Sequence, residues 1–233
     1  MENIYSSGKY LENTKTWHSE DSQWKAEQIT TFLSKNLPSE LSSICEVGCG
    51  SGAIIENLAL RPDFKNTKFF GYDISPQAID IAENQVGRKA EYKLLPVEKI
   101  PNEYDLLMAI DVFEHVPDYL GFLEECKNKA NYKLYHIPLD IHLSSVLRSE
   151  FVKSRAEIGH IHYFSAESAI ATLEDTGHSI IASTYTPVGT GLFLQHPTLK
   201  RAIANIPRVL VSLFSTKLAA RIFGGYSLLI LTK

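Results

Sequence analysis

The stretch "ICEVGCGSGA" carries Gly48, Gly50 and Gly52 directly after a short apolar run. Glycines at alternate positions suit a tight turn with positive φ, and they let backbone N–H groups approach a ligand closely. The apolar run 42–47 predicts a buried strand, and the pattern of 52–60 predicts a helix. The loop is therefore expected at the carboxyl end of a strand, where open α/β sheets bind their ligands.

Strand and helix patterns alternate from residue 42 to residue 137 with short connections, which is typical of parallel strands joined by helical crossovers. We predict an α/β fold with a doubly wound, mostly parallel seven-stranded sheet. Its last strand is antiparallel, helices cover both faces, and helical insertions follow the core. The predicted strands are 42–47, 67–73, 90–95, 104–111, 132–137, 178–186 and 226–233. The predicted helices are 21–37, 52–60, 75–85 (with Ser75 as cap and Pro76 at its start), 117–130, a mostly helical stretch 139–159, 165–177 and a pair within 197–223, with Pro207 opening the second half of that pair.

The composition is that of a soluble globular chain, because 44% of its 233 residues are apolar and 21% are charged. The sequence shows no leader and no apolar span, and its three cysteines form no disulfide framework, so we expect a cytoplasmic protein. The charge is uneven. The first 175 residues hold all 27 acidic and 17 of the 23 basic side chains, whereas six basic and no acidic side chains follow. A net −10 on the larger part argues against a nucleic-acid partner.

Acidic side chains accompany the glycine loop. Glu46 precedes it, and Asp73 ends the second predicted strand. A carboxylate at that place can accept both hydroxyls of a ribose, so a nucleoside cofactor is expected. The pattern Gly48-x-Gly50-x-x-Ala53 also fits an NAD-dependent dehydrogenase, but no second domain follows for a hydride acceptor.

The string E46-V-G48-C-G50-S-G52 with D73, and "AIDVFEHV" at 109–116, resembles class I (Rossmann-like) S-adenosylmethionine-dependent methyltransferases. The similarity is to small-molecule members such as the ubiquinone-type O-methyltransferases. It covers 42–138 by motif and 160–233 more loosely. The resemblance implies one methyltransferase domain over 1–233, with an N-terminal cap at 1–40 and a cofactor-binding core at 42–138. It also implies that 139–164 and 186–224 cover the substrate.

By the same resemblance, a group of residues would hold S-adenosylmethionine: Glu46, Gly48, Cys49, Gly50 and Gly52 at the methionine part, Asp73 at the ribose, Ile74 and Val97 at the adenine, and Asp111 near the methionine end. The family often has an acid at the end of strand three that reads the adenine. Here Leu95-Pro96-Val97 stands in its place, which leaves the Val97 backbone or Glu98. The N-terminal Tyr10, Trp17, His18 or Lys25 could close over the cofactor.

Methyl transfer to a hydroxyl is helped by a base, for which histidine is suited near neutral pH. The candidates are His115, beside Glu114 at the mouth of strand four, His136 at the mouth of strand five, and His160; His162 and His142 are further candidates. Asp111, Glu114 and His115 could also present ligands to a divalent metal. Many relatives carry this string without an ion, so no metal is predicted.

We therefore expect methyl transfer to a small molecule, at oxygen rather than nitrogen. The alternative from another class is a catalytically inactive cofactor-binding or membrane-associated scaffold. The acid-free segment 197–223, in which Lys217 and Arg221 share a helical face, could be a solvated lid. It could also attract a membrane surface or an anionic, lipid-linked or carrier-linked substrate.

Overall fold

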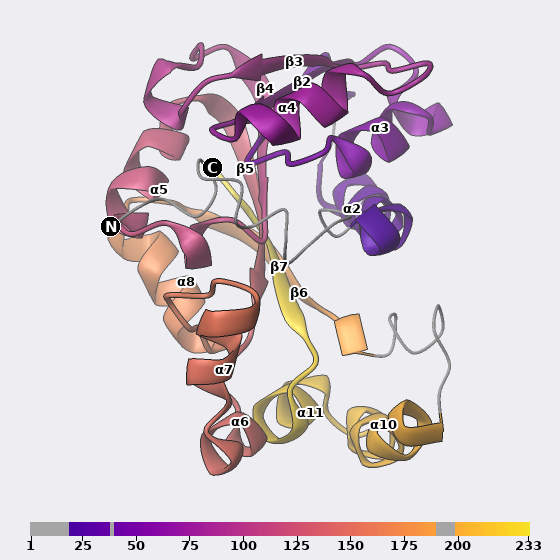
Figure 1. Ribbon diagram of the computed structural model, residues 1–233, viewed down its shortest axis with the longest axis vertical. Helices are drawn as coiled ribbons and strands as arrows, with labels where there is room; N and C mark the ends of the chain where they lie inside the picture. The colour runs from indigo at the N-terminus through magenta and orange to yellow at the C-terminus, as the bar shows by residue number, and fades with distance from the viewer. Residues whose placement is uncertain (1–18, 38–39, 190–198) are drawn as a thin grey trace.

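The structure is a computed structural model that describes residues 19–37, 40–189 and 199–233. Its seven strands form one sheet in the order β3-β2-β1-β4-β5-β7-β6 (Figure 1). The neighbours from β3 to β5 are parallel, whereas β7 is antiparallel to both β5 and β6. The predicted fold class is thereby confirmed. The strands are β1 (Ser43–Val47), β2 (Lys68–Asp73), β3 (Glu91–Leu94), β4 (Tyr104–Ile110), β5 (Ala130–Pro138), β6 (Ile180–Thr186) and β7 (Ser227–Thr232).

Helices cover both faces of the sheet. Figure 1 shows α2 (Ser22–Asn36) and α3 (Ala53–Ala59) on one side, and α5 (Tyr119–Lys127) and α8 (Ala166–Asp175) on the other. The remaining described elements are α4 (Pro76–Glu83), α6 (Leu143–Arg148), α7 (Glu150–Glu157), α10 (Leu199–Ser212), α11 (Thr216–Phe223) and the 3-10 turns η1 (Ser19–Asp21), η2 (Pro62–Phe64), η3 (Val97–Lys99) and η4 (Phe113–His115).

The strands are apolar on both faces, and their alternating side chains form two cores. In β4, Leu106 and Met108 pack with α2, α3 and α4, whereas Leu107 and Ala109 pack with α5, α8 and α11. All four side chains are fully buried. Burial of this kind contributes about 1.5–3 kcal/mol for each large apolar side chain, so β4 is anchored from both sides. The rigid sheet fixes the edge at which the charged residues lie.

Local signals placed most helix starts correctly. Ser75 caps α4 by accepting a hydrogen bond from the Ala78 N–H, and Pro76 is the first helical residue, as predicted. The expectation that a helix begins at Pro117 was two residues early. Asp118 caps α5 instead, because its carboxylate accepts a hydrogen bond from the Gly121 N–H.

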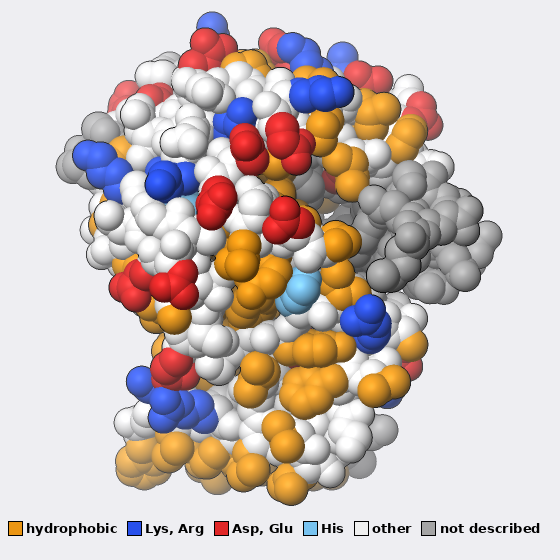
Figure 2. Space-filling view, turned by 90° about the vertical axis from the view of Figure 1, so that its left-hand side faces the viewer, with side chains coloured by type: hydrophobic (Ala, Val, Ile, Leu, Met, Phe, Trp, Pro, Cys, Tyr) orange, Lys and Arg blue, Asp and Glu red, His pale blue; other side chains and the backbone are white. Residues whose placement is uncertain are grey.

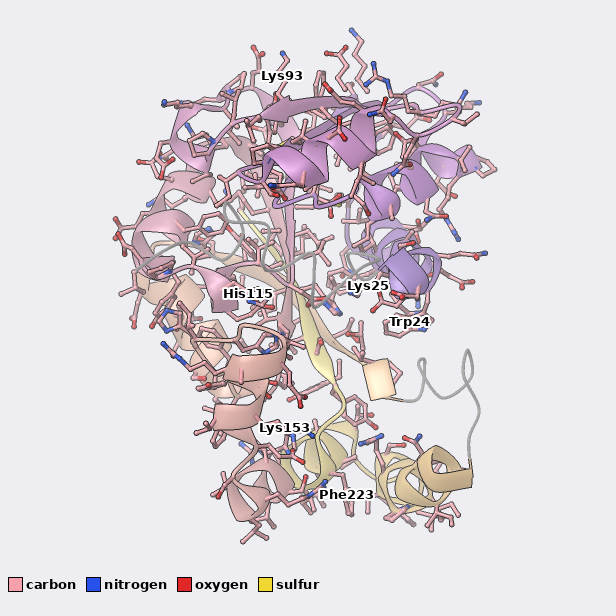
Figure 3. All side chains as sticks on the ribbon, in the orientation of Figure 1. Trp24, Lys25, Lys93, His115, Lys153 and Phe223 are labelled. Carbon is pink, nitrogen blue, oxygen red and sulfur yellow. The ribbon has the colours of Figure 1, made fainter. Side chains whose placement is uncertain are left out.

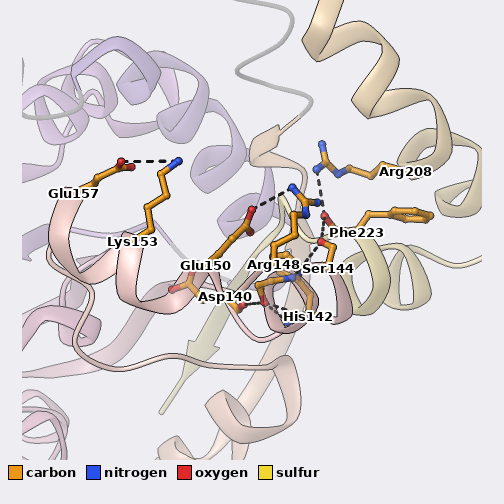
Figure 4. A network of polar contacts seen from close by, with 10 residues as sticks. Asp140, His142, Ser144, Arg148, Glu150, Lys153, Glu157, Arg208 and Phe223 are labelled. Carbon is orange, nitrogen blue, oxygen red and sulfur yellow. Dashed lines mark hydrogen bonds and ion pairs between the residues drawn. The ribbon is translucent and has the colours of Figure 1, made fainter.

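The helical segments after β5 and after β6 meet at one end of the molecule (Figure 1). Polar contacts join them, as Figure 4 shows: the Ser144 hydroxyl on α6 donates to the Phe223 carbonyl on α11, and Arg208 on α10 donates to the same carbonyl. The prediction that Pro207 opens the second helix of this segment is wrong, because Pro207 lies inside α10. The second helix begins after Ser215, whose hydroxyl accepts from the Leu218 N–H.

This end of the molecule exposes many apolar side chains (Figure 2). The exposed ones on α6, on α10 and after it are Leu143, Val146, Leu147, Ile203, Ile206, Val209, Leu210, Leu213, Phe214 and Leu218. Two basic side chains of this segment, Lys217 and Arg221, are half exposed and both pair with Glu167 on α8. None of the described helices is long and apolar enough to span a membrane.

Candidate functional site

The glycine loop between β1 and α3 is shaped by positive φ angles. Gly48, Gly50 and Gly52 have φ of 71°, 53° and 78°. A Cβ on Gly48 would lie 2.7 Å from Cγ2 of Val112, and a Cβ on Gly52 would overlap the Tyr92 ring. A side chain at either position would therefore meet both backbone strain and a steric clash. The fold itself accounts for these two glycines, and the loop ends at the N-terminus of α3.

Asp73 ties this loop to the end of β2. Its Oδ2 accepts a hydrogen bond from the Gly50 N–H at 2.9 Å, and its Oδ1 accepts one from the Ser75 N–H at 2.8 Å. Burial raises the pKa of this carboxyl, although the backbone donors oppose the shift. The neighbouring Ile74 is half exposed at the same edge, and Val97 is buried in η3. The predicted acid and the two predicted apolar contacts therefore lie along one edge of the sheet.

Glu46 lies at the carboxyl end of β1 and is 2% exposed. Its Oε2 has no hydrogen-bond partner within the described part of the chain. Burial raises the pKa of Glu46 to about 8; the positive charge of Lys25 opposes this rise and the charge of Asp73 adds to it. A buried carboxyl without a full set of partners is costly unless a donor or a cation reaches it. Glu46 can thus receive a cationic or donor group placed beside the glycine loop.

A buried ionic chain crosses the ends of β4, β5 and β6. Lys25 on α2 contacts Oδ2 of Asp111 at 2.9 Å, and Nδ1 of His136 contacts Oδ1 of Asp111 at 2.6 Å. His136 Nε2 lies 2.8 Å from the Thr186 hydroxyl, and Lys25 also pairs with Asp21 at 2.9 Å. Burial alone would raise the pKa of Asp111, but His136 and Lys25 outweigh it and hold that pKa well below its usual range. Burial likewise lowers the pKa of Lys25, and the charges of Asp111 and Asp21 more than reverse this.

A second cluster lies beside this chain and consists of Glu114, His115 and His160. One ligating atom from each lies within 4.8 Å of the others. The two imidazole rings are 4.9 Å apart and meet edge to face. His115 Nδ1 is 3.0 Å from the Gly159 carbonyl, and His160 Nδ1 is 2.6 Å from Oδ2 of Asp140. Burial and the charge of Asp111 raise the pKa of Glu114 well above its usual range.

The structure separates the histidine candidates by their partners. His115 and His160 come together in the second cluster, as just described. Both ring nitrogens of His136 are bonded, to Asp111 and to Thr186, so this histidine is built to hold Asp111 in place. His162 faces away from the pair: its Nε2 contacts the Val116 carbonyl at 3.0 Å.

The remaining predicted residues lie outside the two clusters, are paired within the first, or lie outside the described residues. His142 caps α6 by accepting from the Ser145 N–H. Lys25 does not lie open over the edge but is 7% exposed in its ion pairs. Figure 3 shows Lys25 and His115 level with the same stretch of β5 and β7, one on the side of α2 and the other on the side of α7. Tyr10, Trp17 and His18 lie outside the described residues.

Sequence reasoning missed Asp140 and Thr186 as members of the site. Asp140 follows β5 in "YHIPLD" and binds His160, which lies 20 residues further along the chain. A signal was present, because side chains just beyond the carboxyl end of a parallel strand face the ligand edge. Thr186 gave none, because it ends the antiparallel edge strand β6 and resembles any other β-sheet threonine.

Comparisons with known proteins agree with this architecture. Residues 17–183 match the family model of the methyltransferase domain. The ubiquinone biosynthesis O-methyltransferase of Nitrosomonas europaea is 25% identical over 131 residues, which are 51% of this chain and 54% of that protein. That of Bordetella parapertussis is 29% identical over 90 residues, 36% of each chain. This chain therefore spans about half, or less, of the length of these curated relatives.

Two solved structures are similar over nearly the whole chain. Magnesium protoporphyrin IX methyltransferase (ChlM) from Synechocystis PCC 6803 with bound SAH has a TM-score of 0.60 and 15% identity, covering 98% of this chain and 95% of that one. A putative methyltransferase of Haloferax volcanii, in complex with the Trm112 activator, has a TM-score of 0.63 and 16% identity, with 96% of each chain covered. At these identities the likeness concerns the fold.

Proposed function

This chain belongs to the class I S-adenosylmethionine-dependent methyltransferases, and we propose that it transfers a methyl group to an oxygen of a small-molecule acceptor. The observation that carries the proposal is the joint placement of Glu46, the glycine loop and Asp73 at the ends of β1 and β2. The earlier alternative of an NAD-dependent dehydrogenase is wrong, because the chain matches the methyltransferase domain over residues 17–183.

The residues present fit S-adenosylmethionine, which supplies an electrophilic methyl group when bound. The unpartnered Oε2 of Glu46 suits the ammonium group of the amino-acid end. The N–H groups of the loop glycines are bonded within the protein, so the N-terminus of α3 after Gly52 would receive the carboxylate. Asp73 keeps lone pairs for the ribose hydroxyls beyond its two backbone donors. Ile74 offers an apolar face for the adenine, next to Val97.

His115 is proposed as the base that takes the acceptor's proton. A carbonyl oxygen only accepts, so Nδ1 of His115 must donate to Gly159, and the lone pair then lies on Nε2. Nε2 of His115 lies 3.9 Å from Oε1 of Glu114, so the charge of this carboxyl acts on the proposed base. The His160 ring packs against the His115 ring. His136 is proposed as a positioning residue, since its Nδ1 contacts Oδ1 of Asp111 and fixes that carboxylate.

The cofactor assignment is tested by calorimetric binding of S-adenosylhomocysteine to the wild type and to Asp73→Ala. We expect the variant to lose at least about tenfold in affinity, which corresponds to one hydrogen bond to a charged group. Asp80, an exposed acid on α4, serves as the matched control in Asp80→Ala. Equal affinity in the Asp73→Ala variant would contradict the ribose assignment.

Catalysis itself is tested by transfer of a labelled methyl group to an extract of small molecules, followed by identification of the product. A labelled methyl ether or ester supports oxygen as the acceptor atom. Label found only on nitrogen contradicts that choice while leaving methyl transfer intact. Cofactor binding without transfer to any acceptor would favour the inactive scaffold.

The acceptor is proposed to be amphiphilic, either lipid-linked or carrier-linked. This rests on the exposed apolar side chains of α6, α10 and the turn after α10, which form one end of the molecule. Lys217 and Arg221 are engaged by Glu167, so the attraction is expected to depend on apolar contact more than on charge. Flotation with vesicles tests this: the wild type should float, and Leu213→Ser with Phe214→Ser should not. Absence of the wild type from the vesicle fraction contradicts contact with a membrane surface.

A further inference from the structure

Glu114 is a fully buried carboxylate whose needs the protein does not meet. It is 0% exposed, and neither Oε1 nor Oε2 has a hydrogen-bond partner among the residues that the structure describes. Lys25 on α2 does not neutralise Glu114, because its ammonium group is paired with Asp111 and Asp21. A buried carboxyl stays charged when it is paired or coordinates a metal, and otherwise it is protonated. A cation beside Glu114 would therefore stabilise its charged form.

Two histidines aim at the same place. A ring nitrogen of His115 and one of His160 lie within 4.8 Å of each other and of a Glu114 oxygen. His160 is 7% exposed, so the cluster is shielded from bulk water. The distance from Oε1 of Glu114 to Nε2 of His115 is 3.9 Å. This is too long for a hydrogen bond but leaves room for an ion between the two atoms.

The outer partners of the histidines fix which nitrogen faces the centre. His115 Nδ1 donates to the Gly159 carbonyl, and His160 Nδ1 donates to the Asp140 carboxylate. In each neutral ring Nε2 is then the unprotonated nitrogen, which is the atom able to act as a ligand. Metal-binding histidines show this arrangement, in which the second ring nitrogen is held by a carboxylate or a carbonyl.

The backbone also fixes the cluster. The carbonyl of Glu114 accepts hydrogen bonds from the N–H groups of Ile161 and His162 at 2.9 and 3.0 Å. These bonds hold the segment that carries His160 against η4, although the two lie 45 residues apart. The backbone that carries the three side chains is thus held in place before any ligand binds. A preorganised cluster of this kind favours a binding site.

We propose that Glu114, His115 and His160 bind a divalent first-row transition-metal ion, with a coordination position left for an oxygen of the acceptor. Two imidazoles and one carboxylate suit Zn²⁺, Mn²⁺ or Fe²⁺ better than Mg²⁺ or Ca²⁺, which prefer oxygen ligands. The sequence led us to expect no metal and gave Asp111 as the third possible ligand. Both Asp111 oxygens are occupied by Lys25 and His136, and His160 takes its place.

The consequence for chemistry rests on the proposed function. A metal ion beside the acceptor would lower the pKa of a bound hydroxyl, so that its proton leaves more readily to water. Nε2 of His115 then serves as a ligand of the ion and not as the base. The ion would also orient the acceptor oxygen toward the transferred methyl group. Metal binding as such does not depend on methyl transfer, which allows the two proposals to be tested apart.

The test is titration of chelator-treated, full-length protein with Co²⁺, followed by its visible absorption, and competition with Zn²⁺ and with Mg²⁺. We expect one Co²⁺ per chain, displacement by Zn²⁺ and none by Mg²⁺. Glu114→Gln and His160→Asn should each weaken binding by at least about 100-fold, and Asp140→Asn by about 10–100-fold, as for an outer partner of a ligand. His162→Asn is the matched control, because this histidine lies two residues away and faces Val116; its affinity should equal that of the wild type.

Each outcome is decisive. A wild-type protein without a saturable Co²⁺ signal overturns the proposal, and so does a signal that Glu114→Gln and His160→Asn leave unchanged. Because a variant could fail to fold, melting is followed with and without Zn²⁺, and only the wild type and His162→Asn should be stabilised by the ion. Binding of S-adenosylhomocysteine, measured on the same samples, reports on the proposed function separately. Its loss alone would leave the metal site standing.

Discussion

Glu46 is expected to release a proton when the cofactor binds. Burial holds its pKa at about 8 in the free protein. At pH 7 a group with this pKa carries about 0.9 proton. An ammonium group beside the carboxyl favours its charged form and lowers the pKa toward or below the usual value. Binding S-adenosylhomocysteine, which keeps the amino-acid end, should therefore expel most of one proton at pH 7.

The sign of the pH dependence follows from this shift. Protons leave on binding at pH values between the pKa of the bound state and the pKa of about 8 in the free state, so affinity rises with pH across this window. Between pH 6 and pH 7.5 the dissociation constant should fall by about 20-fold, provided that the bound pKa lies below about 5. Above pH 8 the dependence should level off.

Calorimetry in buffers of different ionisation enthalpy measures the number of protons released. The control is Glu46→Gln, which keeps the shape of the side chain but cannot titrate. It should bind more weakly, release no proton, and show no dependence of this kind on pH. Equal proton release in the wild type and in Glu46→Gln, or none in either, would refute the assignment of Glu46 to the ammonium group.

Three further predictions concern folding. Gly52→Ala should lower the free energy of unfolding more than Gly87→Ala, as measured by chemical denaturation. Both glycines have positive φ, but only at Gly52 would the new Cβ meet the Tyr92 ring. A Cβ at Gly87 would have no atom within 4 Å, so Gly87→Ala should show only a backbone cost of about 1 kcal/mol. Lys25→Met should lower the free energy of unfolding by about 3–5 kcal/mol, measured in the same way, because it removes a buried ammonium that pairs with the partly buried Asp111. The wild type should lose stability as the pH rises from 4.5 to about 8, because the folded-state pKa of Glu46 is raised over this window. Glu46→Gln should not show this loss. Thermal melts of both proteins from pH 5 to pH 9 check this.

The sheet could be predicted from the sequence because each strand is recognisable from its own local residue pattern. "YDLLMAI" is apolar at every position that must be buried on one face or the other, and Ser75-Pro76 marks a helix start by geometry that needs no tertiary context. Pro207 misled the prediction because proline is common in the first turn of a helix, whereas here it lies within one. Ser215, the cap that does begin α11, was the weaker signal in the sequence.

The candidate site was most predictable where its residues lie at or just after the carboxyl end of a strand. Glu46, Asp73 and Asp111 do so. The contact of His160 with His115 does not, because it depends on the path of the two helices α6 and α7, which return the chain to η4. No local pattern specifies such a return, so the spacing of Asp111, Glu114 and His115 gave a ligand set that the fold divides.

Asp111 and Glu114 lie three residues apart, yet the fold gives them opposite surroundings. Asp111 has φ of 55°, an uncommon value for a residue with a side chain, and this turn directs its carboxylate to Lys25 and His136. Glu114 enters a buried space where no described residue donates to it. Replacing each acid by its amide should therefore have opposite effects on stability in chelator-treated protein at pH 7.

Asp111→Asn should lower the free energy of unfolding by about 3–5 kcal/mol, because it leaves the buried Lys25 with one carboxylate in place of two. Glu114→Gln removes a carboxyl that must either bury an unpartnered charge or take up a proton on folding, so the variant should be at least as stable as the wild type. Added Zn²⁺ should then reverse the order of wild type and Glu114→Gln, since only the wild type keeps its carboxylate ligand. A Glu114→Gln variant that is strongly destabilised without metal would mean that the protein itself satisfies this carboxylate, and the reasoning from its isolation would fail.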